Sequence, residues 1–155
     1  MVEQWRRERP DVDPSSMAVV ARLTRAHLAA SRAIEGTLGR HGLNRGEFDV
    51  LASLRRSAPP FRLSPGELAR AMVLSPAATT NRVQRLEERG LVVRTPDPTD
   101  GRFGVVELTE AGRELIDAAV TDHVATLDRL LADLPSADRP GFTAMLAAVE
   151  HRAGG

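Results

Sequence analysis

Between Leu63 and Thr109 the chain carries two helix start signals that follow one another closely, and this spacing constrains its fold most. Each signal is a serine followed by a proline, Ser64-Pro65 and Ser75-Pro76. The serine hydroxyl can cap a helix, and proline is well suited to the first helical position. Only about three residues separate the two predicted helices, so they must cross steeply, as in a helix-turn-helix.

Two β-rich runs follow the second of these helices. Gly90 supplies its C-cap, and Leu91–Thr95 and Phe103–Leu108 are rich in valine and other strand-forming residues. The segment 96–101 between them is PDPTDG, a turn-forming composition. A β-hairpin directly behind a helix-turn-helix predicts a wing, and therefore a winged helix-turn-helix.

Helical patterns flank this segment on both sides. Apolar residues recur at helical spacing through Ser15–Arg40, and Asn44 with Glu47 forms a capping-box signal for the next helix. A long helix is predicted from Thr109-Glu110 to about Leu134, and a last one from Ser136 through Val149. The first 14 residues are polar and allow at most a short helix around Trp5. The fold class is thus mainly α with a small β-wing.

The composition supports a folded DNA-binding chain. The 155 residues suffice for one sizeable core, and 42% are apolar. The net charge is zero, but residues 40–105 hold 11 arginines and seven acids, a net of +4, whereas residues 106–155 hold four arginines and nine acids, a net of −5. Positive charge therefore gathers on the segment that would meet DNA. The alternative is a random scatter of charge over a solvated surface.

The second helix of the motif has the residue types that read bases. An α-helix fits the major groove with its N-terminal residues at the base edges, where asparagine can pair with adenine and arginine with guanine. Arg102, at the wing, is expected to reach the minor groove or a phosphate, while single arginines on the helix could instead pair with Glu87 or Glu88. The predicted DNA-binding residues are Ser75, Ala77, Ala78, Thr80, Asn81, Arg82, Arg85 and Arg102.

Residues 43–109 resemble the MarR family of bacterial transcription regulators. The similarity lies in the runs FDVLASLRR, LSPGELARAM, SPAATTNRVQRLEERGLVVR, DPTDGR and VELTEAG. The resemblance implies a homodimer in which N- and C-terminal helices interleave and present two winged modules to a pseudo-palindrome of double-stranded DNA. The expected organisation is an N-terminal extension and dimerisation helix in 1–42, the DNA-binding domain in 43–109 and C-terminal dimerisation helices in 110–155.

The N-terminal extension also resembles the branch of this family that responds to urate and related aromatic or phenolic anions. That resemblance implies an effector pocket built from Trp5, Asp49, Arg56 and Arg94. Trp5 would stack on a planar ligand, and Arg56 would neutralise its charge. The alternative is that Asp49 and Arg56 form structural ion pairs and that Trp5 covers part of the dimer.

Other functions find little support in the sequence. No cysteine is present, which excludes thiol chemistry, and four scattered histidines do not suggest a metal site. No nucleophile–base cluster or phosphate-binding glycine loop appears, so neither an enzyme nor a cofactor is expected. With no signal peptide and no apolar run of about 18 residues, a cytoplasmic protein is expected. The leading hypothesis is a ligand-responsive repressor; the alternative is a DNA-binding regulator without a small-molecule effector.

Overall fold

The computed structural model describes residues 2–57, 59–72, 75–96 and 104–154. Within these ranges the elements are, in chain order, α1 Val2–Glu8, α2 Ser15–Arg40, α3 Arg45–Arg56, β1 Arg62–Leu63, α4 Pro65–Met72, α5 Pro76–Glu88, β2 Val92–Pro96, β3 Gly104–Leu108, α6 Glu110–Leu130 and α7 Arg139–Gly154. The predicted fold class, mainly α with a small β-wing, is confirmed.

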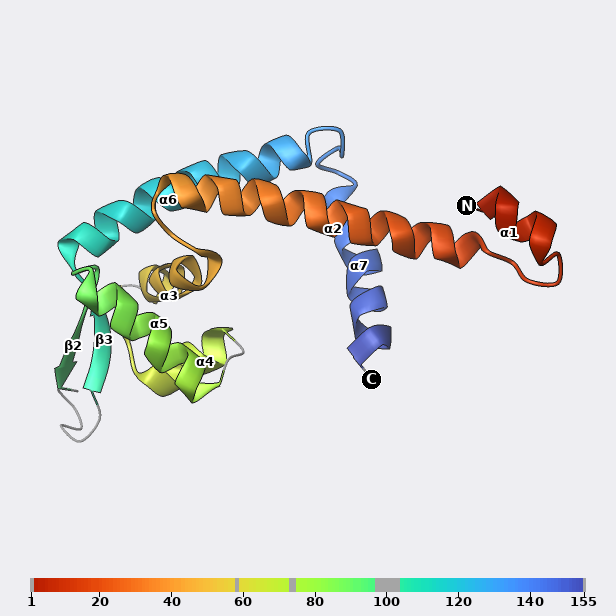
Figure 1. Ribbon diagram of the computed structural model, residues 1–155. Coiled ribbons are helices and arrows are strands. Elements are labelled where there is room, and N and C mark those ends of the chain that lie inside the picture. Colours follow the sequence, from red (N-terminus) through yellow and green to blue (C-terminus); the bar gives the residue numbers. More distant parts are fainter. Residues whose placement is uncertain (1, 58, 73–74, 97–103, 155) are drawn as a thin grey trace.

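Two long helices, α2 and α6, form the frame of the molecule. They lie side by side, and a buried hydrogen bond of 2.8 Å joins Thr37 to Thr126 across them (Figure 1). His41 at the end of α2 adds a 2.9 Å contact to Asp122 on α6. The winged module lies under one end of this pair, whereas α1 lies beyond the other end and α7 turns away from it.

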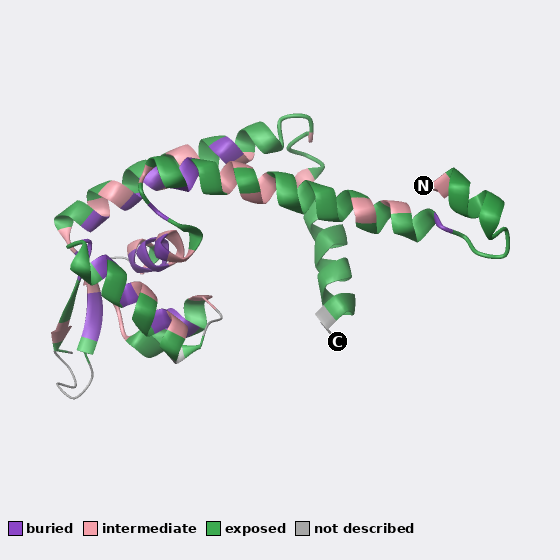
Figure 2. Ribbon diagram, in the orientation of Figure 1, coloured by how far each residue is buried: buried purple, intermediate pink, exposed green. Residues whose placement is uncertain are grey.

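The core lies in the winged module and under α6. Leucines at helical spacing on α3, α4 and α5 point to one another and are fully buried, as Leu51, Leu54, Leu68 and Leu86 show. Figure 2 places most of the buried residues in this part of the chain. Each such leucine stabilises the fold by about 1.5–3 kcal/mol. The module is therefore a rigid unit that can hold a surface helix in place.

The N-terminal capping residues of α3 and α5 make the hydrogen bonds that the sequence predicts. The Asn44 side chain accepts from the Glu47 amide at 2.9 Å, and the Glu47 carboxylate accepts from the Asn44 amide at 3.1 Å, which completes the capping box of α3. The Ser75 hydroxyl accepts from the Ala78 amide at 3.3 Å and caps α5. These caps fix where α3 and α5 begin.

The wing is a three-stranded antiparallel sheet in the order β1-β3-β2. Val92 pairs with Leu108 in one half of the sheet, and Arg62 pairs with Glu107 in the other. The third strand, β1, was not predicted, because two residues are too few to show an alternating pattern. The predicted wing tip, with Arg102, lies outside the described residues.

The end of α5 is joined to the start of α6 by a tight contact. Gly90 turns the chain with φ +68°, and the Thr109 hydroxyl donates to its carbonyl at 2.7 Å while accepting from the Gly112 amide at 3.0 Å. A Cβ on Gly112 would lie 1.9 Å from the Leu91 carbonyl oxygen. Only glycine permits this approach, so α6 starts directly on the turn that ends α5.

Three predicted helix ends differ from those observed, and one of them is the end of α7, which lies at Gly154 rather than at Val149. The helix α6 ends at Leu130 rather than near Leu134, and α7 begins at Arg139 rather than after Ser136. Turns occupy much of the intervening segment, which has a proline at 135 and acids at 133 and 138. Because Pro140 lies in the first turn of α7, its missing amide costs no hydrogen bond.

Candidate nucleic-acid interface

Helix α5 has one buried face and one exposed face. Thr79, Val83 and Leu86 are buried against the module, as their spacing predicts. The opposite face exposes Ser75, Ala77, Thr80, Asn81 and Arg85, with Ala78 partly buried. The predicted helix residues thus lie on the exposed face of α5, which is at the surface of the module (Figure 1).

Arg82 is the exception on this helix, because its side chain is partly buried beside α3. A Cβ on Gly46 would lie 2.7 Å from the Arg82 Cζ atom, so the guanidinium of Arg82 packs closely over the start of α3. Both residues line a small cavity of about 220 Å³, together with Arg85 and Asn81. Arg82 therefore joins α5 to the N-terminus of α3 as well as contributing positive charge.

The two acids at the end of α5 are bound to partners other than Arg82 and Arg85. Glu87 pairs with Arg94 of β2 at 3.2 Å, and Glu88 accepts from Gln84 at 3.1 Å. In the part of the chain that is described, no ion pair is found for Arg82 or Arg85. The alternative reading, in which Glu87 and Glu88 neutralise these arginines, is not what the structure shows, so both charges remain available to phosphate or bases.

Arg89, one turn after Arg85, has a structural role instead. Its guanidinium donates to the Glu47 carboxylate at 3.2 Å, and the Glu47 side chain is only 9% exposed. Glu47 also belongs to the capping box of α3. One buried carboxylate therefore links the start of α3 to the end of α5 and fixes the angle of the exposed helix.

The four residues predicted for an effector pocket lie in different places. Trp5 is on α1 and is 45% exposed. Helix α1 lies past the N-terminal end of α2, whereas α3 lies near the C-terminal end of α2 (Figure 1). Asp49 and Arg56 lie on α3, where Arg56 donates to the Ser53 hydroxyl at 3.2 Å. Arg94 is held by Glu87. Within one chain they are not gathered around a common space.

A larger cavity lies elsewhere, between α3 and α6, and of the four predicted residues only Arg56 lines it. Its volume is about 520 Å³, and its walls include Phe48, Arg55, Asp117 and His123. Sequence reasoning missed these residues. Phe48, Ala52 and Arg55 do share one face of α3 at helical spacing, but nothing local indicates that this face meets α6.

Two further observations concern metals and membranes. Among the residues that the structure describes, no three histidine, aspartate or glutamate side chains are grouped so that they could hold a metal ion. The helices in the same ranges are also too short or too polar to span a bilayer.

An exposed polar helix backed by a helix-turn-helix core and followed by a β-wing defines a winged helix-turn-helix DNA-binding protein. Residues 41–102 match the model of the MarR family, and the curated relatives that match are transcriptional regulators. The chain belongs to the MarR family and is a DNA-binding transcriptional regulator.

Individual relatives support this assignment over nearly the whole chain. The HTH-type transcriptional regulator PecS of Dickeya dadantii is 35% identical over 150 residues, which cover 97% of this chain and 90% of that protein. Among solved structures, CouR of Rhodococcus jostii RHA1 bound to p-coumaroyl-CoA is 31% identical with a TM-score of 0.71, over 82% of this chain and 87% of that one. BpsR of Bordetella bronchiseptica, whose DNA binding is regulated by 6-hydroxynicotinic acid, is 25% identical with a TM-score of 0.72, over 85% and 92%.

Proposed function

We propose that this protein is a homodimeric, cytoplasmic repressor that binds a pseudo-palindromic operator and is released from it by a small aromatic or phenolic anion. The observation that carries the proposal is the exposed face of α5. It combines a capped N-terminus, Thr80 and Asn81 near the base edges, and the cation of Arg85, on a helix whose other face is fully buried. Such a face fits the major groove.

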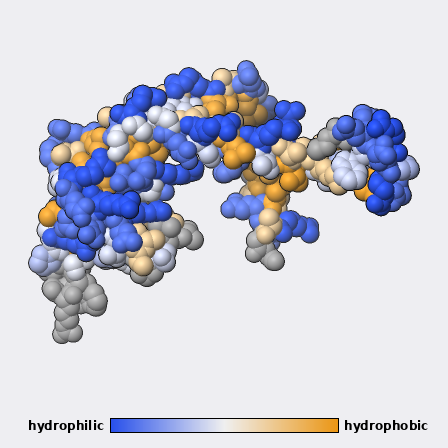
Figure 3. Space-filling model, viewed as in Figure 1, coloured by the Kyte–Doolittle hydropathy of each residue, from blue (hydrophilic) through white to orange (hydrophobic). Residues whose placement is uncertain are grey.

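The homodimer is supported by an apolar surface that one chain leaves uncovered. A groove of about 680 Å³ runs between α2 and α7, and its floor is made almost entirely of apolar side chains. Val19 is 65% exposed and Met145 63%, and every residue from 140 to 153 is exposed. Figure 3 shows apolar atoms where α7 leaves α2. An exposed patch of this kind marks an interface, and a second copy of the same helices would cover it.

Two-fold symmetry would set the form of the operator. A dimer built on the terminal helices carries two copies of α5 and two wings, so it matches two half-sites related by a dyad. In helix-turn-helix dimers the half-sites are about one helical turn apart, or a multiple of that. In this arrangement residues 43–109 contact DNA while 1–42 and 110–155 hold the dimer together.

An effector is supported by the relatives. CouR was solved with p-coumaroyl-CoA and BpsR is regulated by 6-hydroxynicotinic acid, both of which contain an aromatic ring and an acidic function. Trp5, Asp49, Arg56 and Arg94 stay our proposal for residues that respond to such a ligand. Because α1 lies far from α3 within a chain, Trp5 of one subunit would have to meet the α3 residues of the other.

Fluorescence anisotropy with labelled fragments of the protein's own promoter region tests the proposal. We expect one fragment to bind far more tightly than a shuffled sequence of equal length, at a stated salt concentration. Equal affinity for both would overturn the DNA-binding specificity. Titration of the complex with urate, salicylate, p-coumarate and 6-hydroxynicotinate should then release the DNA. If none of them does, the regulator without an effector becomes the better description.

A further inference from the structure

The small cavity of about 220 Å³ lies where α5 packs against the start of α3, and we call it the α3–α5 cavity. Side chains that donate hydrogen bonds line it: Asn44 at the N-cap of α3, and Asn81, Arg82 and Arg85 on α5. All of these except Arg82 are exposed, so the cavity opens to solvent beside the exposed face of α5. A concave surface with several donors and two cations suits an anion that has several oxygen atoms, such as a phosphate group.

Arg82 is held at this cavity without being neutralised. A Cβ on Gly46 would lie 2.7 Å from both the Cζ and the Nε atoms of Arg82, so the guanidinium packs on the backbone of α3. The Glu47 carboxylate also lines the cavity, but it already accepts from Arg89 at 3.2 Å and from the Asn44 amide at 3.1 Å. Within the described ranges Arg82 has no ion pair. An arginine whose position is already fixed loses less conformational entropy when it binds an anion.

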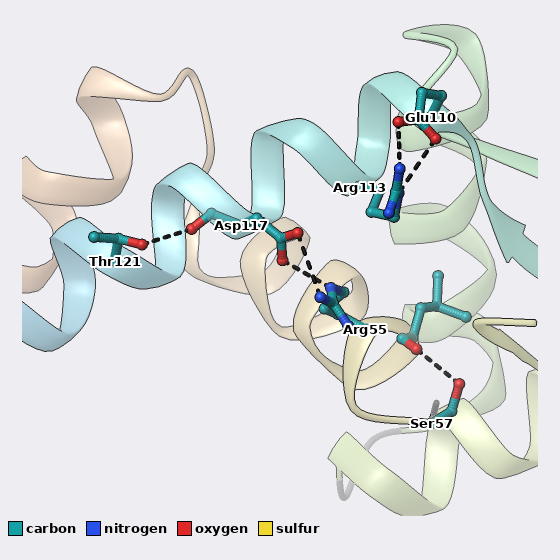
Figure 4. Close-up of polar contacts among 7 residues, drawn as sticks. Arg55, Ser57, Glu110, Arg113, Asp117 and Thr121 are labelled. Carbon is teal, nitrogen blue, oxygen red and sulfur yellow. Dashed lines mark hydrogen bonds and ion pairs between the residues drawn. The ribbon is translucent and has the colours of Figure 1, made fainter. Parts of the chain in front are cut away.

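Two other arginines of the protein show the contrast. Arg55 of α3 donates to Asp117 at 2.7 Å, and Arg113 of α6 pairs with Glu110 (Figure 4). A guanidinium that is already paired contributes little to DNA affinity, because its charge is neutralised before the DNA arrives. Arg82 has the packing contacts of a fixed side chain but no anion among the residues that the structure describes.

The place of Arg82 around the axis of α5 points to the DNA backbone rather than to the bases. Successive residues of an α-helix are turned by about 100°, so Arg82 lies about 60° from the buried Thr79, and Asn81 about 160° from it. A helix with its side chains is roughly as wide as the major groove. Residues opposite the buried face therefore meet base edges, and residues on the flank meet the phosphates that border the groove. Arg82 lies on the flank, and Asn81 faces the bases.

Asn44 brings a second donor to the α3–α5 cavity from outside the helix-turn-helix. Its side-chain oxygen accepts from the Glu47 amide at 2.9 Å as the cap of α3, and this bond fixes the orientation of the side-chain amide group. In the part of the chain that is described, the nitrogen of that amide group has no acceptor. A neutral donor and a fixed cation thus face one open space.

We propose that the α3–α5 cavity of each subunit holds one phosphate of the operator backbone, bound by the guanidinium of Arg82 and the side-chain amide of Asn44. The inference rests on the proposed function, because it requires α5 to lie in the major groove. Such a contact carries no sequence information, but it fixes where α5 lies along the groove. It also extends the DNA contacts from the helix-turn-helix to the helix that precedes it.

Fluorescence anisotropy with the operator fragment and a shuffled fragment tests the role of Arg82 in the full-length protein. Arg82→Gln should weaken binding to both fragments by a similar factor, roughly fivefold or more, so that the ratio of the two affinities stays the same. The plot of log affinity against log salt should become shallower by about 1.8, because each of two subunits loses one phosphate contact worth about 0.9. Asn81→Ala should instead lower the ratio. Arg113→Gln is the matched control and should change neither affinity nor slope.

Replacing single phosphates of the operator by neutral methylphosphonates tests whether the bound group belongs to the DNA. At one position in each half-site, the replacement should weaken the wild type and have no effect on Arg82→Gln, because the contact is already absent from that variant. A cavity that binds only free inorganic phosphate would give no such position, and this result overturns the inference.

Asn44→Asp gives an independent check, because aspartate caps a helix as well as asparagine does but repels a phosphate. The midpoint of urea unfolding should stay the same, while operator affinity falls roughly fivefold or more. Gln4→Glu makes the same exchange of amide for carboxylate on exposed α1 and should bind as the wild type does. Should Arg82→Gln fail to fold, Asn44→Asp decides alone.

Unchanged affinity of either variant, or an effect of Arg82→Gln that is confined to the operator fragment, overturns this inference alone. Loss of specific operator binding by the wild type overturns the proposed function instead.

Discussion

Arg85 and Arg89 lie one turn apart at the end of α5 but have different surroundings. Arg89 is held by the buried carboxylate of Glu47, whereas Arg85 is exposed with no ion pair among the described residues. Guanidinium groups that are already paired contribute little to DNA affinity, while free ones release counterions and can pair with guanine. Arg85 is therefore expected to contact DNA, and Arg89 to position the helix.

Replacing Arg85 with alanine should weaken specific operator binding by about 1–3 kcal/mol, because a base or phosphate contact is lost. Anisotropy titrations with the operator fragment measure this difference. The same substitution at Arg113, a half-buried arginine of α6 that is paired with Glu110, is the matched control and should leave affinity unchanged. If both variants bind like the wild type, α5 does not enter the groove through this residue.

Substituting Glu47 with alanine should lower the free energy of unfolding by about 1–3 kcal/mol, because the α3 capping box and the partner of Arg89 disappear together. Urea unfolding followed by circular dichroism gives this value. Glu8→Ala removes an exposed carboxylate on α1 and should change stability by less than about 0.5 kcal/mol. Equal stabilities for the two variants would contradict the linking role of Glu47.

At the level of elements, short-range signals fix where helices begin and end. Asn44 with Glu47, Ser75 and Gly90 each determine a boundary through contacts within a few residues, and each was predicted. The close approach of α6 to the preceding turn depends on distant parts of the chain. It is visible in the contact between Gly112 and Leu91 and in the hydrogen bond of Thr109 to Gly90.

Gly112→Ala should be strongly destabilising, since its Cβ would lie 1.9 Å from the Leu91 carbonyl oxygen and backbone must move. We expect a loss of more than about 1 kcal/mol in the free energy of unfolding, as for other overpacked positions. Gly36→Ala on α2 meets nothing within 4 Å and should instead stabilise the helix by about 0.5–1 kcal/mol. Opposite signs in thermal or urea unfolding are the expected result.

The difference between contacts within a few residues and contacts between distant segments explains how far the sequence predicts function. The exposed face of α5 could be predicted because its residues lie on one helix and its N-cap, where spacing alone sets the exposed side; that this face contacts DNA is our proposal. The α3–α6 cavity could not, because Arg55 and Asp117 are brought together only by packing between helices. The strand β1 was missed for a related reason: its pairing with β3 has no local pattern.

At the level of the whole molecule, a single chain leaves a large apolar surface uncovered. Its winged module has a closed core, but α7 has no buried residue in the described part, and apolar side chains of α2 face the same open groove. A single copy would expose this surface to water, so association is expected to be part of its stability.

Val19→Lys should weaken or abolish the dimer, because it places a charge in an apolar groove that already contains Arg22 and Arg25. Sedimentation velocity at micromolar concentration should show the wild type as a dimer and the variant shifted towards monomer. Val93→Lys makes the same change on β2, opposite Glu107, and should remain dimeric. A monomeric wild type would refute the homodimer.

The hydrogen bonds of Thr109 join the turn at Gly90, which ends α5, directly to the start of α6. The position of α5 is therefore fixed relative to the long helix α6. In a dimer, the distance between the two copies of α5 is then set by the packing of the terminal helices. This distance cannot change to match a different spacing of half-sites. Inserting about five base pairs between the half-sites would turn one of them to the opposite side of the duplex. Such a promoter should be bound no better than one with a single half-site.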